Sequence, residues 1–231
     1  MSELRPDGGI EVTPADLERL EMRWARSWDP SEVAERLDGI DAPWAVAAGW
    51  ALELFLGKPM RAHGDIEIAV PAARFGEVRE RFPEYAFDAV GDHRIWEDAS
   101  AEVLAATHQT WVRDRETGDY LLDVFREPHA DDVWVCRRDE TIRLPYADVI
   151  LRTADGIPYL APEIVLLFKA KGLRDKDQAD FEAARPVMTQ RQCEALSGLL
   201  SRVHPGHPWL AGLASQPRPR KARSPLAAVR P

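Results

Sequence analysis

Residues 48–70 read AGWALELFLGKPMRAHGDIEIAV, and this stretch decides the fold that we expect. Its last six residues alternate acidic and aliphatic side chains, which is the period of a half-buried strand. Asp65 and Glu67 therefore leave one face of the strand, while Ile66 and Ile68 point into the core. Two carboxylates that converge repel each other unless a cation lies between them. Because carboxylate oxygens suit Mg²⁺ and Mn²⁺, the pattern predicts a divalent metal site.

A third acidic residue lies farther along the chain, in the segment 120–125, which reads YLLDVF. Asp123 is the only charged residue of this segment, and an unpaired buried carboxylate is costly. A metal shared with the first two acids would provide its partner, and two such ions can activate an attacking oxygen and neutralise a leaving phosphate. The alternative for Asp123 is an ion pair with Arg113 or Arg126.

The remaining sequence predicts an α+β protein: a mixed β-sheet core flanked by helices, followed by a helical C-terminal subdomain. We expect residues 1–160 to form the αβ domain with its N-terminal helices, 161–213 the helical subdomain, and 214–231 a disordered basic tail. The expected helices and strands follow from periodicity and from Pro and Gly signals. The helices are near 14–28, 31–37, 50–56, 71–82, 162–171, 175–185 and 189–203. The strands are near 44–47, 65–70, 85–90, 93–97, 107–114, 120–126 and 132–137, and residues 149–159 form a further strand pair around the turn Asp155-Gly156.

Composition excludes several classes of protein. The 231 residues are 45% hydrophobic and 30% charged, as in soluble globular proteins. A net charge of −9 argues against a sequence-independent nucleic-acid binder, which needs a surplus of Lys and Arg. Cys136 and Cys193 show no metal-binding spacing and are expected to be reduced thiols in a cytoplasmic protein. No secretory signal and no membrane span is expected.

Two separate blocks of sequence resemble a known family. Gly-Trp followed by Leu-Gly-x-x-x-Arg-x-His-x-Asp-Ile-Glu, ending at Glu67, resembles the aminoglycoside 2″-adenylyltransferase branch of the polymerase-β-like nucleotidyltransferases, together with its lincosamide-modifying relatives. The second block reads APEIVLLFKAK over 161–171 and continues with RDKDQADF over 174–181. About a hundred residues separate the two blocks, so their joint occurrence makes the resemblance specific. It extends over roughly 40–185.

The resemblance implies the transfer of a nucleoside monophosphate from an NTP, ATP being expected, to a hydroxyl of a small molecule such as an aminoglycoside-like antibiotic. Asp65 and Glu67 would bind Mg²⁺, or alternatively Mn²⁺, and Asp123 would be the third metal ligand, the base that accepts the hydroxyl proton, or both. The turn at Gly49 would face the triphosphate, because missing side-chain bulk lets phosphate approach backbone amides. The other residues expected at the nucleotide are Trp50, Arg61, His63, Lys169, Lys171 and Lys176.

The chain departs from the wider superfamily at two positions. Ala48 stands where Ser or Gly is usual in the phosphate turn, so only backbone N–H groups could contact phosphate there. Glu67 replaces the commoner Asp. Two alternative functions therefore stay open at this point: a nucleotidyltransferase that acts on RNA or protein, and a catalytically inactive nucleotide-binding relative. The acids Glu97, Asp98 and Glu102 are either a lining for a cationic acceptor or a solvated loop.

Overall fold

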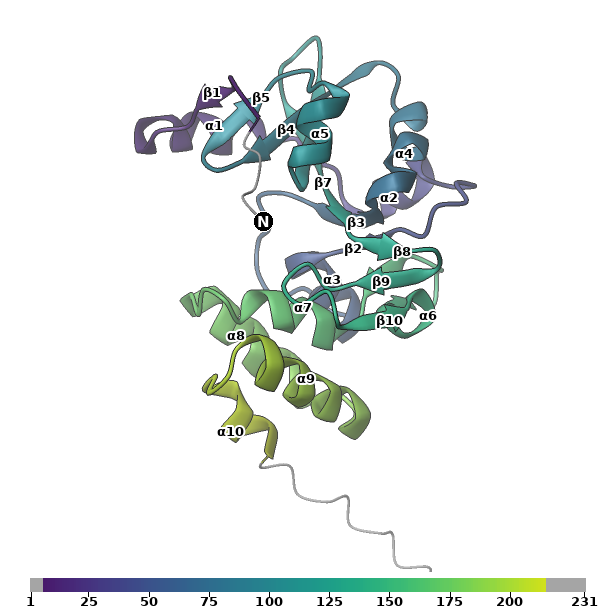
Figure 1. Ribbon diagram of the computed structural model, residues 1–231, viewed down its shortest axis with the longest axis vertical. Coiled ribbons are helices and arrows are strands. Elements are labelled where there is room, and N and C mark those ends of the chain that lie inside the picture. Colours follow the sequence, from purple (N-terminus) through teal and green to yellow (C-terminus); the bar gives the residue numbers. More distant parts are fainter. Residues whose placement is uncertain (1–5, 215–231) are drawn as a thin grey trace, which may run out of the picture.

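The computed structural model describes residues 6–214 and confirms the α+β class (Figure 1). The strands are β1 (Ile10–Glu11), β2 (Ala45–Val46), β3 (Glu67–Pro71), β4 (Tyr85–Gly91), β5 (Arg94–Trp96), β6 (Gln109–Asp114), β7 (Tyr120–Glu127), β8 (His129–Ala130), β9 (Val133–Val135), β10 (Arg143–Pro145), β11 (Ile150–Arg152) and β12 (Pro158–Leu160). The α-helices are α1 (Leu17–Arg23), α2 (Pro30–Arg36), α3 (Ala48–Leu56), α4 (Phe75–Arg81), α5 (Ala101–Ala106), α6 (Tyr146–Val149), α7 (Pro162–Lys169), α8 (Asp175–Ala184), α9 (Gln190–Val203) and α10 (Trp209–Ala214).

A nine-stranded mixed sheet forms the centre of the molecule, in the order β1-β5-β4-β6-β7-β3-β2-β12-β11. Most neighbours are antiparallel, but β3 runs parallel to β7, and β2 runs parallel to β12. A second sheet of three strands, β10-β9-β8, follows β7 along the chain. The parallel pair matters most, because it joins the two segments that carry the predicted acids.

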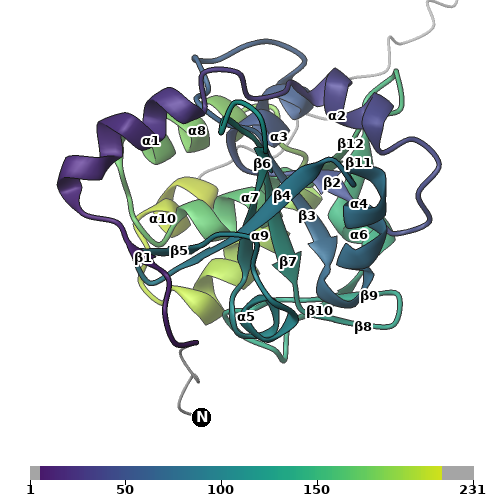
Figure 2. The same ribbon diagram turned by 90° about the horizontal axis from the view of Figure 1, so that it is seen from above.

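One face of the large sheet packs against α2 and α4, which lie near each other in both views (Figure 2). Ile66 and Ile68 are fully buried in this core, as their alternation with the acids predicts. Helix α2 begins at the N-cap Asp29, whose carboxylate accepts hydrogen bonds from the backbone amides of Ser31 and Glu32. The cap fixes the position from which Val33 enters the core.

The other face packs against α3 and the C-terminal helices, which gather at one end of the molecule (Figure 1). Helix α3 ends at Gly57, which adopts the left-handed conformation at φ 64° and confirms the predicted C-cap. A single hydrophobic core extends from β2 and α3 into α7, α9 and α10. The change from strands to helices after β12 is therefore a change of secondary structure inside one continuous core.

Several elements differ from the sequence-based expectation. The first helix ends at Arg23 instead of near 28, and β3 begins at Glu67, so Asp65 precedes the strand. Helix α5 was not expected, because its six residues are too short for periodicity to identify. The predicted tail lies outside the described residues except for residue 214, which ends α10. No helix within residues 6–214 is long and apolar enough to cross a membrane.

Replacing Leu52 with Ala tests whether the core is continuous. Leu52 lies in α3, is fully buried, and shares its core with α7 and α9. We expect the variant to lose about 2–5 kcal/mol of unfolding free energy, because a buried leucine leaves a cavity. Urea unfolding followed by circular dichroism and by tryptophan fluorescence should give one coincident transition in both the wild type and the variant.

The matched control is Leu17→Ala. Leu17 is 53% exposed on α1, so its truncation should change stability by less than about 0.5 kcal/mol. Two separate transitions in the wild type would contradict a core shared between the sheet and the C-terminal helices.

Candidate active site

The predicted acids meet at the junction of β3 and β7. Glu67 and Asp123 are register partners in the parallel pair, and paired residues project from the same face of a sheet. The backbone N–H of Asp123 donates to the carbonyl of Ile66 at 2.9 Å, which fixes this register. Asp65 lies two residues before Glu67 and raises the pKa of both other acids by its negative charge. The structure therefore places the three carboxyl groups near enough for their charges to interact.

The electrostatics of this junction are unfavourable for three charged carboxylates. Burial raises the pKa of Glu67 well above its ordinary value, and the charges of Asp65 and Asp123 raise it further; Lys169 and Arg61 act in the opposite direction. Burial likewise raises the pKa of Asp123, against a hydrogen bond from the Gln109 side chain. Such repulsion is what a divalent cation would relieve.

The alternative ion pairs for Asp123 are not formed. Arg113 pairs instead with Asp88, at 2.6 Å, and the Arg126 guanidinium donates to the hydroxyl of Thr110 at 2.9 Å. Asp123 is 2% exposed, and its Oδ1 has no hydrogen-bond partner among the described residues. A buried carboxylate oxygen without a donor is rare in folded proteins.

The donor set fits a hard cation, since it offers only carboxylate oxygens, one of which is unpaired. Within residues 6–214, however, no three acidic, histidine or cysteine side chains are already grouped as a closed metal site. Mg²⁺ binding by Asp65, Glu67 and Asp123 therefore remains a proposal, in which the side chains close around the ion.

A pocket of about 640 Å³ opens beside the acids, and its walls include both Asp65 and Glu67. The first residues of α3, Ala48 and Gly49, line it together with the N-cap Ala47. Ala48 has a φ of 49°, a left-handed conformation that is unusual for alanine and marks a sharp corner between β2 and α3. The free amides at the start of a helix attract anions, so this corner suits a phosphate group.

Gly49 has a packing reason to be glycine as well. A Cβ at this position would lie 2.4 Å from Cε1 of His63 and 2.6 Å from a guanidinium nitrogen of Arg61. The indole of Trp50 stacks on His63, with 4.6 Å between ring centroids, and its N–H donates to the carbonyl of Asp65 at 3.0 Å. Trp50, Arg61 and His63 thus form the support beneath the acids.

Glu53 completes this support, although sequence reasoning did not identify it. One oxygen of its buried carboxylate accepts from the backbone amides of Met60, at 2.7 Å, and Arg61, at 3.1 Å, and lies 2.8 Å from Nε2 of His63. Burial alone would raise the pKa of Glu53, but these hydrogen bonds outweigh it and lower the pKa. The available signal was a lone acid inside the apolar helix 48–56.

The predicted lysines occupy three different environments. Lys169 lines the pocket, but it is buried and pairs with Asp180 at 2.7 Å and with Asp177 at 3.4 Å. Lys176 is exposed and lines the pocket, whereas Lys171 is exposed and lies outside the lining. Basic residues that the sequence analysis did not single out also line the pocket: Arg137, Arg138 and Arg174.

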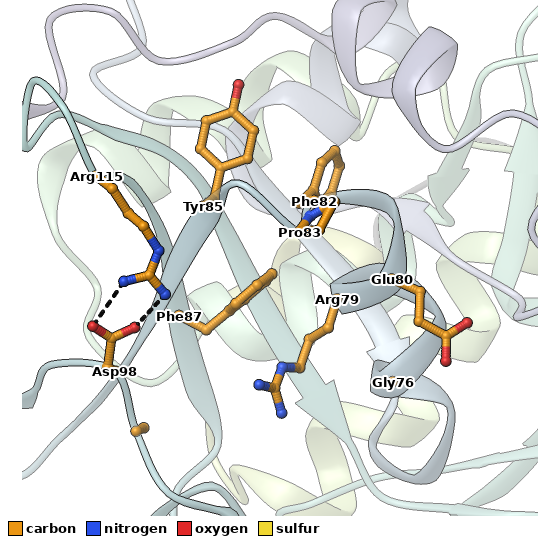
Figure 3. A pocket seen from close by; sticks show the side chains of 10 residues that line it. Gly76, Arg79, Glu80, Phe82, Pro83, Tyr85, Phe87, Asp98 and Arg115 are labelled. Atoms are coloured by element: carbon orange, nitrogen blue, oxygen red, sulfur yellow. Dashed lines mark hydrogen bonds and ion pairs between the residues drawn. The ribbon is translucent and has the colours of Figure 1, made fainter.

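The acidic group Glu97, Asp98 and Glu102 lies elsewhere. Asp98 accepts two hydrogen bonds from the guanidinium of Arg115, at 2.7 and 3.0 Å, at the edge of a separate pocket (Figure 3). Glu97 and Glu102 are exposed, and all three side chains are absent from the lining of the pocket beside Asp65. The group is therefore largely a solvated surface, in which Asp98 forms ion pairs with Arg115 and Arg113.

Comparison with known proteins agrees with the first sequence block. Residues 31–110 match the family model of aminoglycoside-2″-adenylyltransferase, and this segment contains Gly49, Asp65 and Glu67. Among solved structures, a lincomycin-bound lincosamide antibiotic adenylyltransferase, LnuA, is 18% identical, with a TM-score of 0.46, and covers 78% of this chain and 100% of its own. The enzyme ANT(2″)-Ia in complex with adenylyl-2″-tobramycin is 17% identical, with a TM-score of 0.49, and covers 74% of this chain and 95% of its own.

An antigenic nucleotidyltransferase-like protein from Paracoccidioides brasiliensis is 15% identical, with a TM-score of 0.43, covering 90% of this chain and 96% of its own. No curated protein matches the chain. The family match covers residues 31–110, which include the first of the two blocks. Over this segment the chain is similar to aminoglycoside-2″-adenylyltransferase.

Proposed function

We propose that the protein transfers a nucleoside monophosphate from an NTP to a hydroxyl group of a small molecule. ATP is the expected donor, Mg²⁺ the expected metal, and an aminoglycoside-like antibiotic the expected acceptor. The observation that carries this proposal is the register pair Glu67 and Asp123, with Asp65 beside it, next to the helix corner at Ala48. The family match over residues 31–110 supports the same chemistry.

Each acid has a distinct role in this proposal. Asp65 and Glu67 hold the metal, and Asp123 completes the ligand set and accepts the proton of the attacking hydroxyl through its unpaired Oδ1. Mg²⁺, when bound, stabilises the negative charge that develops on the transferred phosphoryl group. Residues 47–49 orient the triphosphate with backbone amides.

Positive side chains along the pocket would stabilise the leaving pyrophosphate. Lys176 and Arg137 are exposed cations in the lining, and neither forms an ion pair among the described residues. Arg174 also lines the pocket, although Asp177 neutralises it at 2.7 Å. Lys169 holds α7 against α8 through its two aspartates, so it contributes charge to the site without a direct phosphate contact. Lys171 has no role here.

The size of the pocket favours a small acceptor. A volume of about 640 Å³ lies within the range of sites for drug-sized ligands. A net charge of −9 also favours a cationic acceptor over nucleic acid. The basic tail that would serve a macromolecular acceptor lies outside the described residues.

Asp65→Ala and Asp123→Asn should both abolish transfer. The protein is incubated with Mg²⁺, labelled ATP or GTP, and a panel of aminoglycosides and lincosamides; pyrophosphate and mass-shifted acceptor are measured. Losing a metal ligand or the base should lower kcat by at least about 10³-fold, because both act on the developing charge. Glu97→Gln, on the exposed surface, is the matched control and should retain wild-type activity. Label on RNA or on the protein itself would contradict a small acceptor, and nucleotide binding without turnover would contradict catalysis.

Although Asp123→Asn should abolish transfer, it should increase the stability of the metal-free protein. The neutral side chain removes the repulsion with Asp65 and can still accept from Gln109. In EDTA we expect the variant to be more stable than the wild type by on the order of 1–3 kcal/mol. Millimolar Mg²⁺ should raise the melting temperature of the wild type and leave that of the variant unchanged. Equal responses of both proteins to Mg²⁺ would contradict a metal ligand at this position.

A further inference from the structure

Strand β6 brings two N–H donors to the carboxyl group of Asp123. Trp111 on β6 is the register partner of Asp123 on β7, and residues directly opposite each other in an antiparallel pair project from the same face. Gln109 lies two residues before Trp111, so its side chain shares that face. Neither residue is a metal ligand or a nucleotide contact in the proposed function.

Gln109 binds one oxygen of this carboxyl group. Its side-chain amide donates a hydrogen bond to Oδ2 of Asp123. The intrinsic preference of an aspartate for one rotation of its carboxyl group is weak, because the terminal torsion is broad. A donor fixed on Oδ2 therefore determines the direction of Oδ1, which is the oxygen that accepts the hydroxyl proton in the proposed function.

Trp111 is the second donor. Its indole N–H is buried and has no hydrogen-bond partner among the described residues, and the same holds for Oδ1 of Asp123. Burial raises the pKa of Asp123, whereas Gln109 and the indole of Trp111 lower it, so the indole N–H acts on this carboxyl group. A carboxylate oxygen has two lone pairs, and one remains for a hydroxyl when the indole donates to the other.

Asp88 is the other carboxyl group beside Trp111, but its oxygens are already bound. It is the register partner of Trp111 on β4. Arg113 donates to both of its oxygens, at 2.6 and 3.1 Å, and the backbone amide of Asp98 donates to Oδ1 at 2.9 Å. The indole N–H is therefore left for Asp123.

Aromatic rings hold the indole of Trp111 in place. Trp24 of α1 meets it edge-on, with 5.4 Å between ring centroids, and Tyr120 lies 4.7 Å away on β7. Arg23 attaches α1 to this group, because its guanidinium lies 3.9 Å from the centroid of Tyr120 and donates to the carbonyl of Gly118 at 2.7 Å. Helix α1 thus acts on the carboxyl group through the indole ring.

We propose that Gln109 and Trp111 are positioning residues, which hold the carboxylate of Asp123 so that Oδ1 faces the acceptor hydroxyl. The proposal rests on the proposed function for the role of Asp123 as the base. Holding a base in one orientation removes an entropic part of the barrier, so the two donors act on the rate of the chemical step. They touch neither substrate, and substrate affinity should not depend on them.

Trp111→Phe removes the N–H and keeps an aromatic ring, and Gln109→Leu removes the amide at similar volume. Each should lower kcat about 10- to 100-fold, the usual loss when a residue that orients a functional group is removed. KM for ATP and for the acceptor should change less than about threefold. Trp96→Phe is the matched control and should match the wild type, because it removes an indole N–H that donates to the carbonyl of Asp7, at 3.1 Å. A wild-type kcat in Trp111→Phe or in Gln109→Leu would overturn the proposal.

Proton–nitrogen NMR separates this proposal from the proposed function, since it needs no nucleotide, metal or acceptor. The chain has eight tryptophans, and the indole resonance that is missing from Trp111→Phe belongs to Trp111. In Asp123→Ala, which lacks the acceptor, this resonance should move upfield, while that of Trp96 stays in place and reports an intact fold. Such a shift supports the contact even if the wild type transfers nothing. An unchanged Trp111 resonance would overturn it, whatever the outcome for transfer.

Discussion

The rest of the structure depends on one constraint: Asp65, Glu67 and Asp123 repel each other and must still be held close together. The parallel pairing of β3 with β7 places Glu67 directly beside Asp123, where burial removes the water that would otherwise screen them. A protein gains no stability from such an arrangement by itself. This unfavourable arrangement is one observation that supports the metal site proposed above.

Holding these acids in place requires a rigid support, and the segment 57–66 receives one from α3. Glu53 binds two backbone amides of this segment and His63, while Trp50 stacks on His63 and binds the carbonyl of Asp65. The absence of a side chain at Gly49 lets His63 approach the helix. One turn of α3 therefore orients the loop that carries the first acid and also presents its amides to the pocket.

The pocket has two ends of different chemistry. Near α3 and α8 its lining combines carboxylates with helix amides and the cations Arg174 and Lys176, which suits a metal and a polyphosphate. Farther along β7, the buried Glu127 lines the same pocket, and the charges of Arg137 and Arg138 act on its carboxyl group.

The sequence alone identified the three acids that interact in the structure and the face of β3 that enters the core. Alternation placed Ile66 and Ile68 in the core opposite Glu67, because a strand has a period of two that tertiary contacts cannot shift without exposing an entire face. The C-cap at Gly57 was also readable, since it depends on local backbone conformation, whereas the corner before α3 lies at Ala48 and Gly49 is already inside the helix.

Only the tertiary structure decided which charged side chains form ion pairs and which do not. The sequence predicted that Lys169 contacts phosphate, but two aspartates of α8 form ion pairs with it. Glu53, His108 and Glu127 gave only weak signals, because their partners lie on other segments and burial depends on how those segments pack. Local sequence specifies periodicity and turns; the pairing and desolvation of charges arise only when distant segments meet, and these decide what the pocket can bind.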